Sequence, residues 1–348
     1  MPLSLVSEVE PFLLLNGDDD VLIAKQSSKK GTRLRSFGDE IELRQDVPAG
    51  HKVARRAVAE GQPVRRYGQI IGFATQLIER GEHVHIHNLA VGELRQTYEV
   101  GVDRRPVAMV PPSEMRHFQG FRRRDGRVGT RNYVAILSTV NCSASVSQFV
   151  RERFRDVSRD FPNVDGVIAL THKSGCGQVL GGEDHRLLQR VLAGYARHPN
   201  VAAYVVIGLG CEVNQAPVLV ERHKMSLMDR PGQRPPVITI QEAGGVRKAV
   251  EAATRAVAEL LPLANDARRS REPVSELVLA TNCGGSDGNS GITANPALGY
   301  AVDELVRHGG TGVLAETPEI YGAEQLLVRR ANDERVAAKL LSRFEWWQ

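Results

Sequence analysis

The sequence of 348 residues lacks the features that mark several large classes of protein. It has no apolar run near the roughly 18 residues that a membrane-spanning helix needs, and its N-terminus lacks the basic-then-apolar order of a signal peptide. It has no Gly-x-x-x-x-Gly-Lys-Ser/Thr loop, so nucleotide hydrolysis has no support. The net charge of +4 is mild. We therefore expect a cytoplasmic protein that binds neither nucleic acid nor membrane.

Cysteine is scarce, and no Cys-x-x-Cys pair suggests a structural zinc site. In a reducing compartment such residues are thiols, metal ligands or catalytic groups rather than disulfides. Each follows a short β-branched run and lies in a turn before a helix: Cys142, Cys176, Cys211 and Cys283. Because parallel strands end at one edge of a sheet, we predict that at least three of the four sulfur atoms share a pocket there.

Two sequence patterns predict the domain organisation. Residues 1–95 alternate short strand-like runs with glycine and proline turns, which is typical of a small all-β domain. Residues 96–117 contain three prolines and are predicted to be a linker. Residues 118–348 alternate strands with helices, which predicts a doubly wound, mostly parallel α/β domain.

Two loops are candidates for chemistry. TNCGGSDGNSG (Thr281–Gly291) would let the backbone approach a small polar ligand, although a mobile surface turn is the alternative. In THKSGCGQ, His172 could act as a general base or only as a hydrogen-bonding loop residue. The presence of Cys176, Cys211 and Glu212 in this and a later loop favours a catalytic role for His172. A single cysteine, however, is most often a small buried apolar residue.

Histidines alternate with apolar residues in HVHIHN, which spans residues 83–88. On a strand the three imidazoles would share one face, and the valine and isoleucine between them would face the core. Imidazoles two residues apart can bind one divalent transition metal, and Asn88 could add an oxygen or orient a water. The alternative is a solvated polar face. We predict that His85 and His87 bind an exchangeable metal in the cleft between the two domains.

Arg131 and Asn132 enter the first strand of the predicted α/β domain. Arginine binds carboxylates through two parallel hydrogen bonds, so this pair is a candidate substrate-binding site.

Several long motifs occur in order: GHKVA, YGQIIG, GEHVHIHN, DGRVGTRN, GLGCEVNQ, CGGSDGNSGITANP and ETPEIYGAEQLL. The sequence closely resembles the altronate and galactarate dehydratases, and its triple histidine is more similar to the altronate branch. The resemblance implies an N-terminal SAF domain of β-clip type over about residues 11–92, followed by a dehydratase region. It also implies a hydro-lyase that depends on Fe²⁺ or Mn²⁺ and acts on sugar acids.

The loop chemistry and the resemblance together imply metal-assisted β-elimination of water from an altronate-like acid, which gives a 2-keto-3-deoxy acid. In this hypothesis His172 is the base, and Glu212 or Glu316 assists departure of the β-hydroxyl, with Cys176 and Cys211 as further catalytic candidates. The predicted substrate-binding residues are Arg131, Asn132, Ser286, Asp287 and Asn295.

Two other functions remain open. An iron–sulfur dehydratase would use three of the four cysteines as cluster ligands and leave one iron open to substrate. A non-catalytic chain would only bind a sugar acid.

Members of the resembled family continue beyond the equivalent of Gln348, so we expect a truncated chain. The apolar residues of the final helix would then need a partner surface, supplied by a homo-oligomer or a complementing C-terminal chain. These apolar residues are Leu340, Leu341, Phe344 and Trp347.

Overall fold

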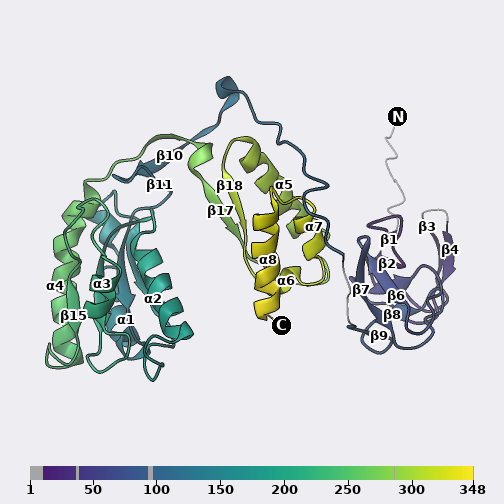
Figure 1. The fold of residues 1–348 in the computed structure, drawn as a ribbon, viewed down its shortest axis with the longest axis horizontal. Helices are drawn as coiled ribbons and strands as arrows, with labels where there is room; N and C mark the ends of the chain where they lie inside the picture. Colours follow the sequence, from purple (N-terminus) through teal and green to yellow (C-terminus); the bar gives the residue numbers. More distant parts are fainter. Residues whose placement is uncertain (1–10, 37–38, 93–96, 286, 348) are drawn as a thin grey trace, which may run out of the picture. The chain divides into compact units, whose positions relative to one another are not determined.

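The computed structural model describes residues 11–36, 39–92, 97–285 and 287–347, and Figure 1 shows their ribbon. The chain divides into two compact units. Unit 1 comprises the residues up to 108 together with 278–307 and those from 312 onward, and unit 2 comprises 109–277 and 308–311. The division at residue 277 lies inside the predicted domain 118–348, where no boundary was predicted.

The N-terminal part of unit 1 is built of short strands, which confirms the predicted all-β region. The strands are β1 (Phe12–Leu13), β2 (Val21–Ala24), β3 (Arg33–Ser36), β4 (Asp39–Glu42), β5 (Lys52–Ala54), β6 (Pro63–Arg66), β7 (Gln69–Ala74), β8 (His83–Val84) and β9 (Leu89–Ala90). They form sheets of order β1-β2-β5-β8, β6-β7-β9 and β3-β4. All of these pairs are antiparallel.

Strand β2 explains why this small region has two apolar cores. Leu22 packs in one core with Phe12, while Val21 packs in the other with Ala54. Successive side chains of a strand point to opposite faces, so one strand can contribute to both cores. All four β2 residues are therefore buried.

One turn recurs four times around these strands. In each copy a glycine with positive φ donates its N–H to a carbonyl across the sheet: Gly31 to Leu43, Gly50 to Ala24, Gly61 to Ala74 and Gly81 to Ala54, at 2.7–2.8 Å. Only glycine adopts this conformation without strain.

Unit 2 contains the predicted parallel sheet. Its strands are β12 (Tyr133–Ser138), β13 (Gly166–Leu170), β14 (Val201–Gly208) and β15 (Val237–Thr239), in the order β13-β12-β14-β15. All three pairs are parallel, and the β12–β13 register runs from Tyr133 opposite Gly166 to Leu137 opposite Leu170.

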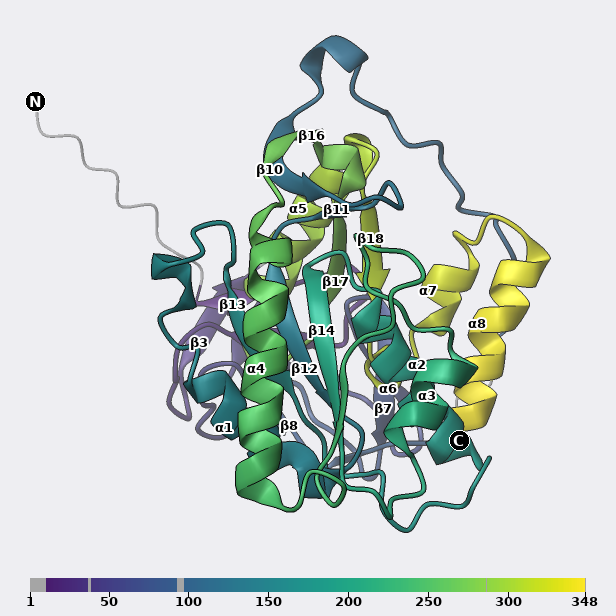
Figure 2. The ribbon, with the colours of Figure 1, turned by 90° about the vertical axis from the view of Figure 1, so that its left-hand side faces the viewer.

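Helices cover both faces of this sheet (Figure 2). Helix α1 (Ala144–Glu152) packs beside α4 (Val246–Asn265), and α2 (Glu183–Ala196) packs beside α3 (Ala216–Arg222). Every residue of β14 is buried, as expected for a strand covered on both faces. The predicted doubly wound α/β architecture is confirmed.

A small antiparallel sheet lies where the chain enters and leaves the core of unit 2. It consists of β10 (His117–Arg122), β11 (Val128–Gly129) and β16 (Ser270–Pro273), in the order β11-β10-β16. Single 3₁₀ turns occur at Pro112–Glu114, Asn141–Ser143, Val157–Arg159 and Val274–Glu276.

The remaining elements are strands β17 (Val278–Thr281) and β18 (Thr311–Leu314) and helices α5 (Ala294–Arg307), α6 (Thr317–Ile320), α7 (Glu324–Val328) and α8 (Glu334–Trp347). The two strands pair as a separate sheet. The segment after β9 contacts the helices, because the N–H of Gly101 donates to Val328 and the hydroxyl of Tyr98 donates to Glu324 at 2.8 Å. These bonds explain why residues near 100 belong to unit 1.

The apolar residues of α8 have two different environments. Leu340 and Leu341 pack against a small core around Val328, and Phe344 is only 5% exposed. The expectation that these three need another surface is therefore wrong, since α7 lies close in the same unit. Trp347 remains 50% exposed.

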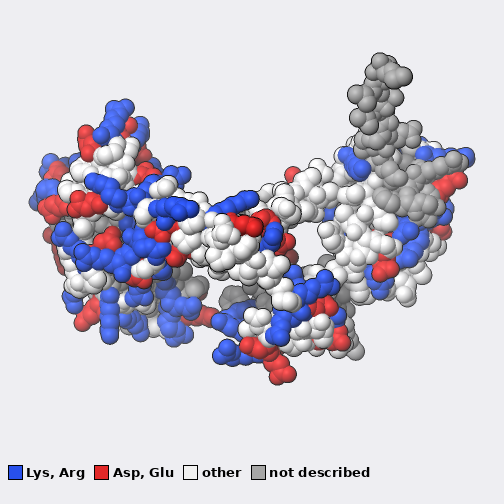
Figure 3. All heavy atoms as spheres, turned by 90° about the horizontal axis from the view of Figure 1, so that it is seen from above, with Lys and Arg blue, Asp and Glu red and all other residues white. Residues whose placement is uncertain are grey.

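Charges of both signs are interspersed over the face drawn in Figure 3. Within the described residues, no helix is both long enough and apolar enough to span a bilayer.

Candidate functional site

Four histidine rings gather in the all-β part of unit 1. The ring centroid of His51 lies 5.0 Å from that of His83 and 5.2 Å from that of His85. His83 in turn lies 5.5 Å from His85 and 5.6 Å from His87. Pairing of β5 with β8 brings His51 to the other three. Sequence reasoning missed His51, although the GHKVA motif contains it.

His85 and His87 lie on a turn rather than on a strand. Strand β8 ends at Val84, and the buried Asn88 closes the turn: its Oδ1 accepts the N–H of His85 at 2.9 Å and its Nδ2 donates to the carbonyl of His83 at 3.0 Å. Ile86 is 85% exposed, so the prediction that it faces the core is wrong. A turn does not alternate its side chains between two faces.

The two inner histidines are poor bases. Burial lowers the pKa of His83 to about 4, and the neighbouring imidazoles and Lys52 add to the effect. Burial also lowers the pKa of His51, whose Nδ1 lies 2.8 Å from Nε2 of His83. One ring donates a proton in this contact, and that ring keeps a lone pair on its other nitrogen. Neutral imidazole is the form that binds transition metals.

The histidine cluster fits a divalent transition metal by its donor atoms. Imidazole nitrogen suits several transition metals, Fe²⁺ among them, whereas Mn²⁺ prefers carboxylate and water oxygens, so of these two ions the donor set suits Fe²⁺ better. As the side chains stand, no three His, Cys, Asp or Glu residues in the described part of the chain are arranged to hold an ion. Binding of an ion by this cluster would therefore require its rings to rotate.

The glycine-rich loop after β17 reaches this cluster within unit 1. A Cβ built on Gly50, the residue before His51, would lie 3.4 Å from Cα of Gly288. A Cβ built on Gly288 would in turn lie 3.3 Å from Cα of Gly50, so the two backbones approach closely. The loop therefore lies against the residue that precedes His51, and the loop and the histidine cluster are neighbouring candidates for one site.

Asp287 fixes the conformation of that loop. Its Oδ1 accepts the N–H groups of Asn289 and Ser290 at 2.9 and 2.8 Å and the Ser290 hydroxyl at 3.0 Å. These bonds lower the pKa of Asp287, and the bond from the Ser290 hydroxyl has the largest effect. Asp287 is therefore a carboxylate at neutral pH. The predicted substrate ligand Ser286 lies outside the described residues.

A cavity of about 510 Å³ lies at the start of the same loop and contains three predicted site residues, Cys283, Asn295 and Glu316. Oε2 of Glu316 accepts the N–H of Cys283 at 2.9 Å. Glu316 has φ +64°, a conformation that costs a non-glycine residue about 1–3 kcal/mol. Such strain is concentrated at functional sites.

The other three cysteines lie in loops of unit 2, and the pocket predicted for them stays a prediction. Cys142, Cys176 and Cys211 follow β12, β13 and β14, which are adjacent parallel strands, so all three lie at the carboxyl edge of the sheet. All three are exposed free thiols. Cys283 follows β17 in unit 1 and is not part of this edge.

Hydrogen bonds occupy His172 and Glu212 at the same edge. His172 Nε2 lies 2.9 Å from the carbonyl of Ser138, and its Nδ1 accepts the N–H of Ser174 at 3.1 Å. The buried Glu212 accepts the Thr139 hydroxyl at 3.0 Å and two loop N–H groups. These contacts favour a role in shaping the loops. To act as a base, His172 would have to release Ser174.

Arg131 and Asn132 lie at the opposite edge, because they precede β12. Asn132 is fully buried, donates to the carbonyls of Asn163 and Ala264 at 2.6 and 2.8 Å, and accepts Arg123 Nη2 at 2.8 Å. Arg131 pairs with Asp165 at 3.4 Å. These contacts give Asn132 a structural role, and the substrate role of the pair stays a prediction.

We expect Asn132→Ala to lower the free energy of unfolding of unit 2 by about 2–3 kcal/mol, because three buried groups lose a partner. The neighbouring Arg131→Ala, which breaks only an exposed ion pair, should cost at most about 0.5–1 kcal/mol. Hydrogen exchange of peptides from β12 measures both. Unchanged protection in Asn132→Ala would contradict the structural role.

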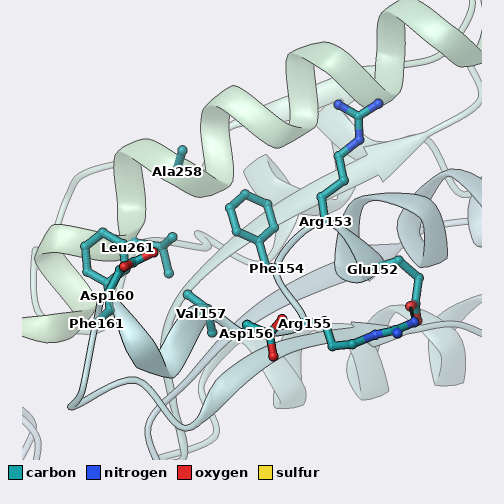
Figure 4. A pocket seen from close by; sticks show the side chains of 10 residues that line it. All are labelled: Glu152, Arg153, Phe154, Arg155, Asp156, Val157, Asp160, Phe161, Ala258 and Leu261. Atoms are coloured by element: carbon teal, nitrogen blue, oxygen red, sulfur yellow. Dashed lines mark hydrogen bonds and ion pairs between the residues drawn. The ribbon is translucent and has the colours of Figure 1, made fainter.

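A further cavity of about 380 Å³ in unit 2 is lined by the end of α1, the turn after it and the end of α4 (Figure 4). Phe154, Phe161 and Leu261 form its apolar wall. Both helices begin at the carboxyl edge, so this cavity lies at the opposite end of the sheet from the thiols. It contains no predicted site residue.

The architecture is that of a β-rich N-terminal region joined to a doubly wound α/β unit and a further helical segment. Three family models match it in order: "Altronate/galactarate dehydratase SAF domain" at residues 10–92, "D-galactarate dehydratase/Altronate hydrolase, second domain" at 120–265, and "D-galactarate/Altronate dehydratase, C-terminal" at 274–348. The chain belongs to the altronate/galactarate dehydratase family.

Known relatives agree with this assignment. Altronate dehydratases of Bacillus subtilis (strain 168) and Escherichia coli (strain K12) are 37% and 36% identical over 96% and 95% of this chain. The L-threo-forming galactarate dehydratase of Escherichia coli (strain K12) is 35% identical over 97% of it. The matched region spans 65% of the length of each of these three relatives.

Proposed function

We propose that this chain contributes the metal-binding and substrate-binding parts of a hydro-lyase that removes water from an altronate-like sugar acid to give a 2-keto-3-deoxy acid. The observation that carries the proposal is the contact of the glycine-rich loop with Gly50, beside four gathered imidazoles. Its relatives named for altronate and galactarate dehydration support this substrate class.

The histidines would hold the metal, with His85 and His87 as exposed ligands and His51 and His83 as inner ones. When bound, Fe²⁺ would polarise the substrate carboxylate and an adjacent hydroxyl and stabilise the developing enediolate charge. The donor atoms make Mn²⁺ a weaker second choice.

The chain's own residues would bind and orient the acid. The backbone of the glycine-rich loop offers N–H groups to a carboxylate or hydroxyl. Asp287 keeps that loop in one conformation, and Asn295 lines the neighbouring cavity. These residues act by positioning the substrate.

Glu316 is the candidate that would take the proton α to the substrate carboxylate and give it to the departing β-hydroxyl, which leaves as water. One of its carboxylate oxygens accepts the N–H of Cys283, and Glu316 lines the cavity beside the glycine-rich loop. The hydrogen bonds of His172 and Glu212 make them weaker candidates in their present conformation.

Anaerobic loading of the full chain with Fe²⁺, followed by incubation with altronate or galactarate and NMR detection of a 2-keto-3-deoxy acid, tests the proposal. We expect Glu316→Gln to lower turnover about 100-fold without changing bound iron. Glu319→Gln, which alters another carboxylate of the same cavity, should stay within about threefold of the unchanged chain. Binding of the sugar acid without turnover would support a non-catalytic binding chain instead.

A further inference from the structure

The cavity beside the glycine-rich loop contains one cation that the proposed function does not use. Arg330 follows the end of α7 and lines this cavity of about 510 Å³ together with Glu316 and Asn295. Among the described residues that line the cavity, it is the only lysine or arginine. A cavity of this size falls in the range of small-molecule sites. Arg330 is therefore the side chain there that can neutralise an anionic group of a ligand.

The guanidinium of Arg330 is held at one nitrogen and free at the other two. Its Nε donates to the carbonyl of Leu326, four residues earlier, at 3.1 Å. Neither η nitrogen forms a hydrogen bond or an ion pair with a described residue. The nearby carboxylate of Asp103 pairs instead with Arg329. The two η nitrogens of Arg330 thus form a fork that a carboxylate can accept.

A purely structural role is the alternative, because a basic side chain at the end of a helix can cap its last carbonyls. The bond from Nε of Arg330 to Leu326 is of this kind. A cap of this kind occupies one N–H group and leaves the fork open toward other partners. The two roles are therefore compatible, and they differ in whether the charge of a ligand matters.

Three carboxylates line the same cavity and decide how an acid can enter it. Asp303, Glu316 and Glu319 all belong to the lining, and in the described part of the chain none of them forms an ion pair with Arg330. Apolar side chains of α5 and β18 line the rest, and a low local dielectric strengthens both attraction and repulsion. A carboxylate of the ligand is therefore favoured next to Arg330 and disfavoured elsewhere in the cavity.

We propose that Arg330 binds the carboxylate of the sugar acid, and that the three acidic residues restrict the cavity to acids with a single carboxylate. Arg330 would act on the substrate class of the proposed function, on which this inference rests. The hydroxyl groups of such an acid can donate to Asp303 and Glu319, whereas the second carboxylate of a diacid would meet them as a like charge. A carboxylate has about four lone-pair sites, so a bond with Arg330 leaves others for the proposed metal.

Calorimetric titration of the full chain with altronate and with altritol, which has a hydroxymethyl group in place of the carboxylate, tests the proposal without turnover. We expect Arg330→Gln to raise the Kd of altronate about tenfold or more and to leave that of altritol within about twofold. Arg330→Lys keeps the charge but not the planar fork, and it should raise the Kd of altronate about threefold. Arg343→Gln, at an exposed arginine of α8 in the same unit, is the matched control and should change neither value.

The restriction to a single carboxylate has its own comparison. The unchanged chain should bind galactarate, which is a diacid, at least about tenfold more weakly than altronate. Asp303→Asn removes one like charge, so it should strengthen galactarate binding about fivefold and leave altronate binding within about twofold. Galactarate bound as tightly as altronate would overturn the restriction.

The role of Arg330 and the proposed function can fail separately. Altronate binding that depends on Arg330, in a chain that forms no keto acid after Fe²⁺ loading, would support the role of Arg330 and contradict the proposed function. Turnover and altronate binding that Arg330→Gln leaves unchanged would support the function and overturn the role. Equal loss of altronate and altritol binding would also overturn it, because loss of the helix cap affects both ligands alike. Hydrogen exchange of α7 reports whether the cap is lost.

Discussion

Replacement of both His85 and His87 by alanine is expected to lower the iron bound by the chain at least about tenfold, because both imidazoles are proposed to bind the metal directly. The loss should arise without unfolding. Both side chains are exposed, and the turn that carries them is held by Asn88 through backbone atoms. Metal analysis of anaerobically purified chain measures the effect, with hydrogen exchange of β5 and β8 as the check on folding.

His117→Ala is the matched control, since His117 is an exposed histidine of unit 2. It should retain the bound iron. His51→Ala should also lower iron, because its ring completes the cluster next to His83. Full iron content in the His85/His87 double variant would reduce the cluster to a solvated surface.

Gly81→Ala should lower the free energy of unfolding of the SAF region by about 4 kcal/mol. A Cβ at Gly81 would lie 2.0 Å from the carbonyl oxygen of Glu42, and Gly81 has φ +82°. The left-handed conformation and the backbone clash each cost about 1–3 kcal/mol. Hydrogen exchange of peptides from β2 and β5 reports this local stability without assuming that the whole chain unfolds in one step.

The equivalent turn provides the control. Gly61 has φ +76° but no atom within 4 Å of its built Cβ, so Gly61→Ala carries the conformational cost alone, about 1 kcal/mol. The difference between the two variants isolates the contact with Glu42. Equal effects of both replacements would show that the close approach at Gly81 contributes nothing.

The histidine turn shows where local pattern ceases to be informative. The alternation in HVHIHN predicted one strand face, but β8 ends at Val84 because Asn88 satisfies the backbone groups of a turn. The rings still converge, but the cause is the turn and the pairing of strands rather than the alternation of residue types. His51 joins them only through the pairing of β5 with β8, and strand pairing between distant segments cannot be read from local periodicity.

Arg131 and Asn132 show a second limit. Their residue types suit carboxylate binding, and the sequence correctly places them at the start of a strand. The start of a parallel strand lies at the edge opposite to its end, and Asn132 is consumed by buried hydrogen bonds there. Residue type alone does not distinguish a substrate-binding role from a structural one.

The sequence by itself determined the all-β region, the doubly wound α/β architecture, the family motifs and the placement of three cysteines after successive strands. These features depend on local periodicity, on turn residues and on the rule that parallel strands end at one edge. Tertiary structure alone decided that Cys283 belongs to the other unit, that His51 joins the histidine cluster and that the glycine-rich loop lies against Gly50. Such contacts depend on how distant segments pack, and packing is set by the whole chain rather than by any local pattern.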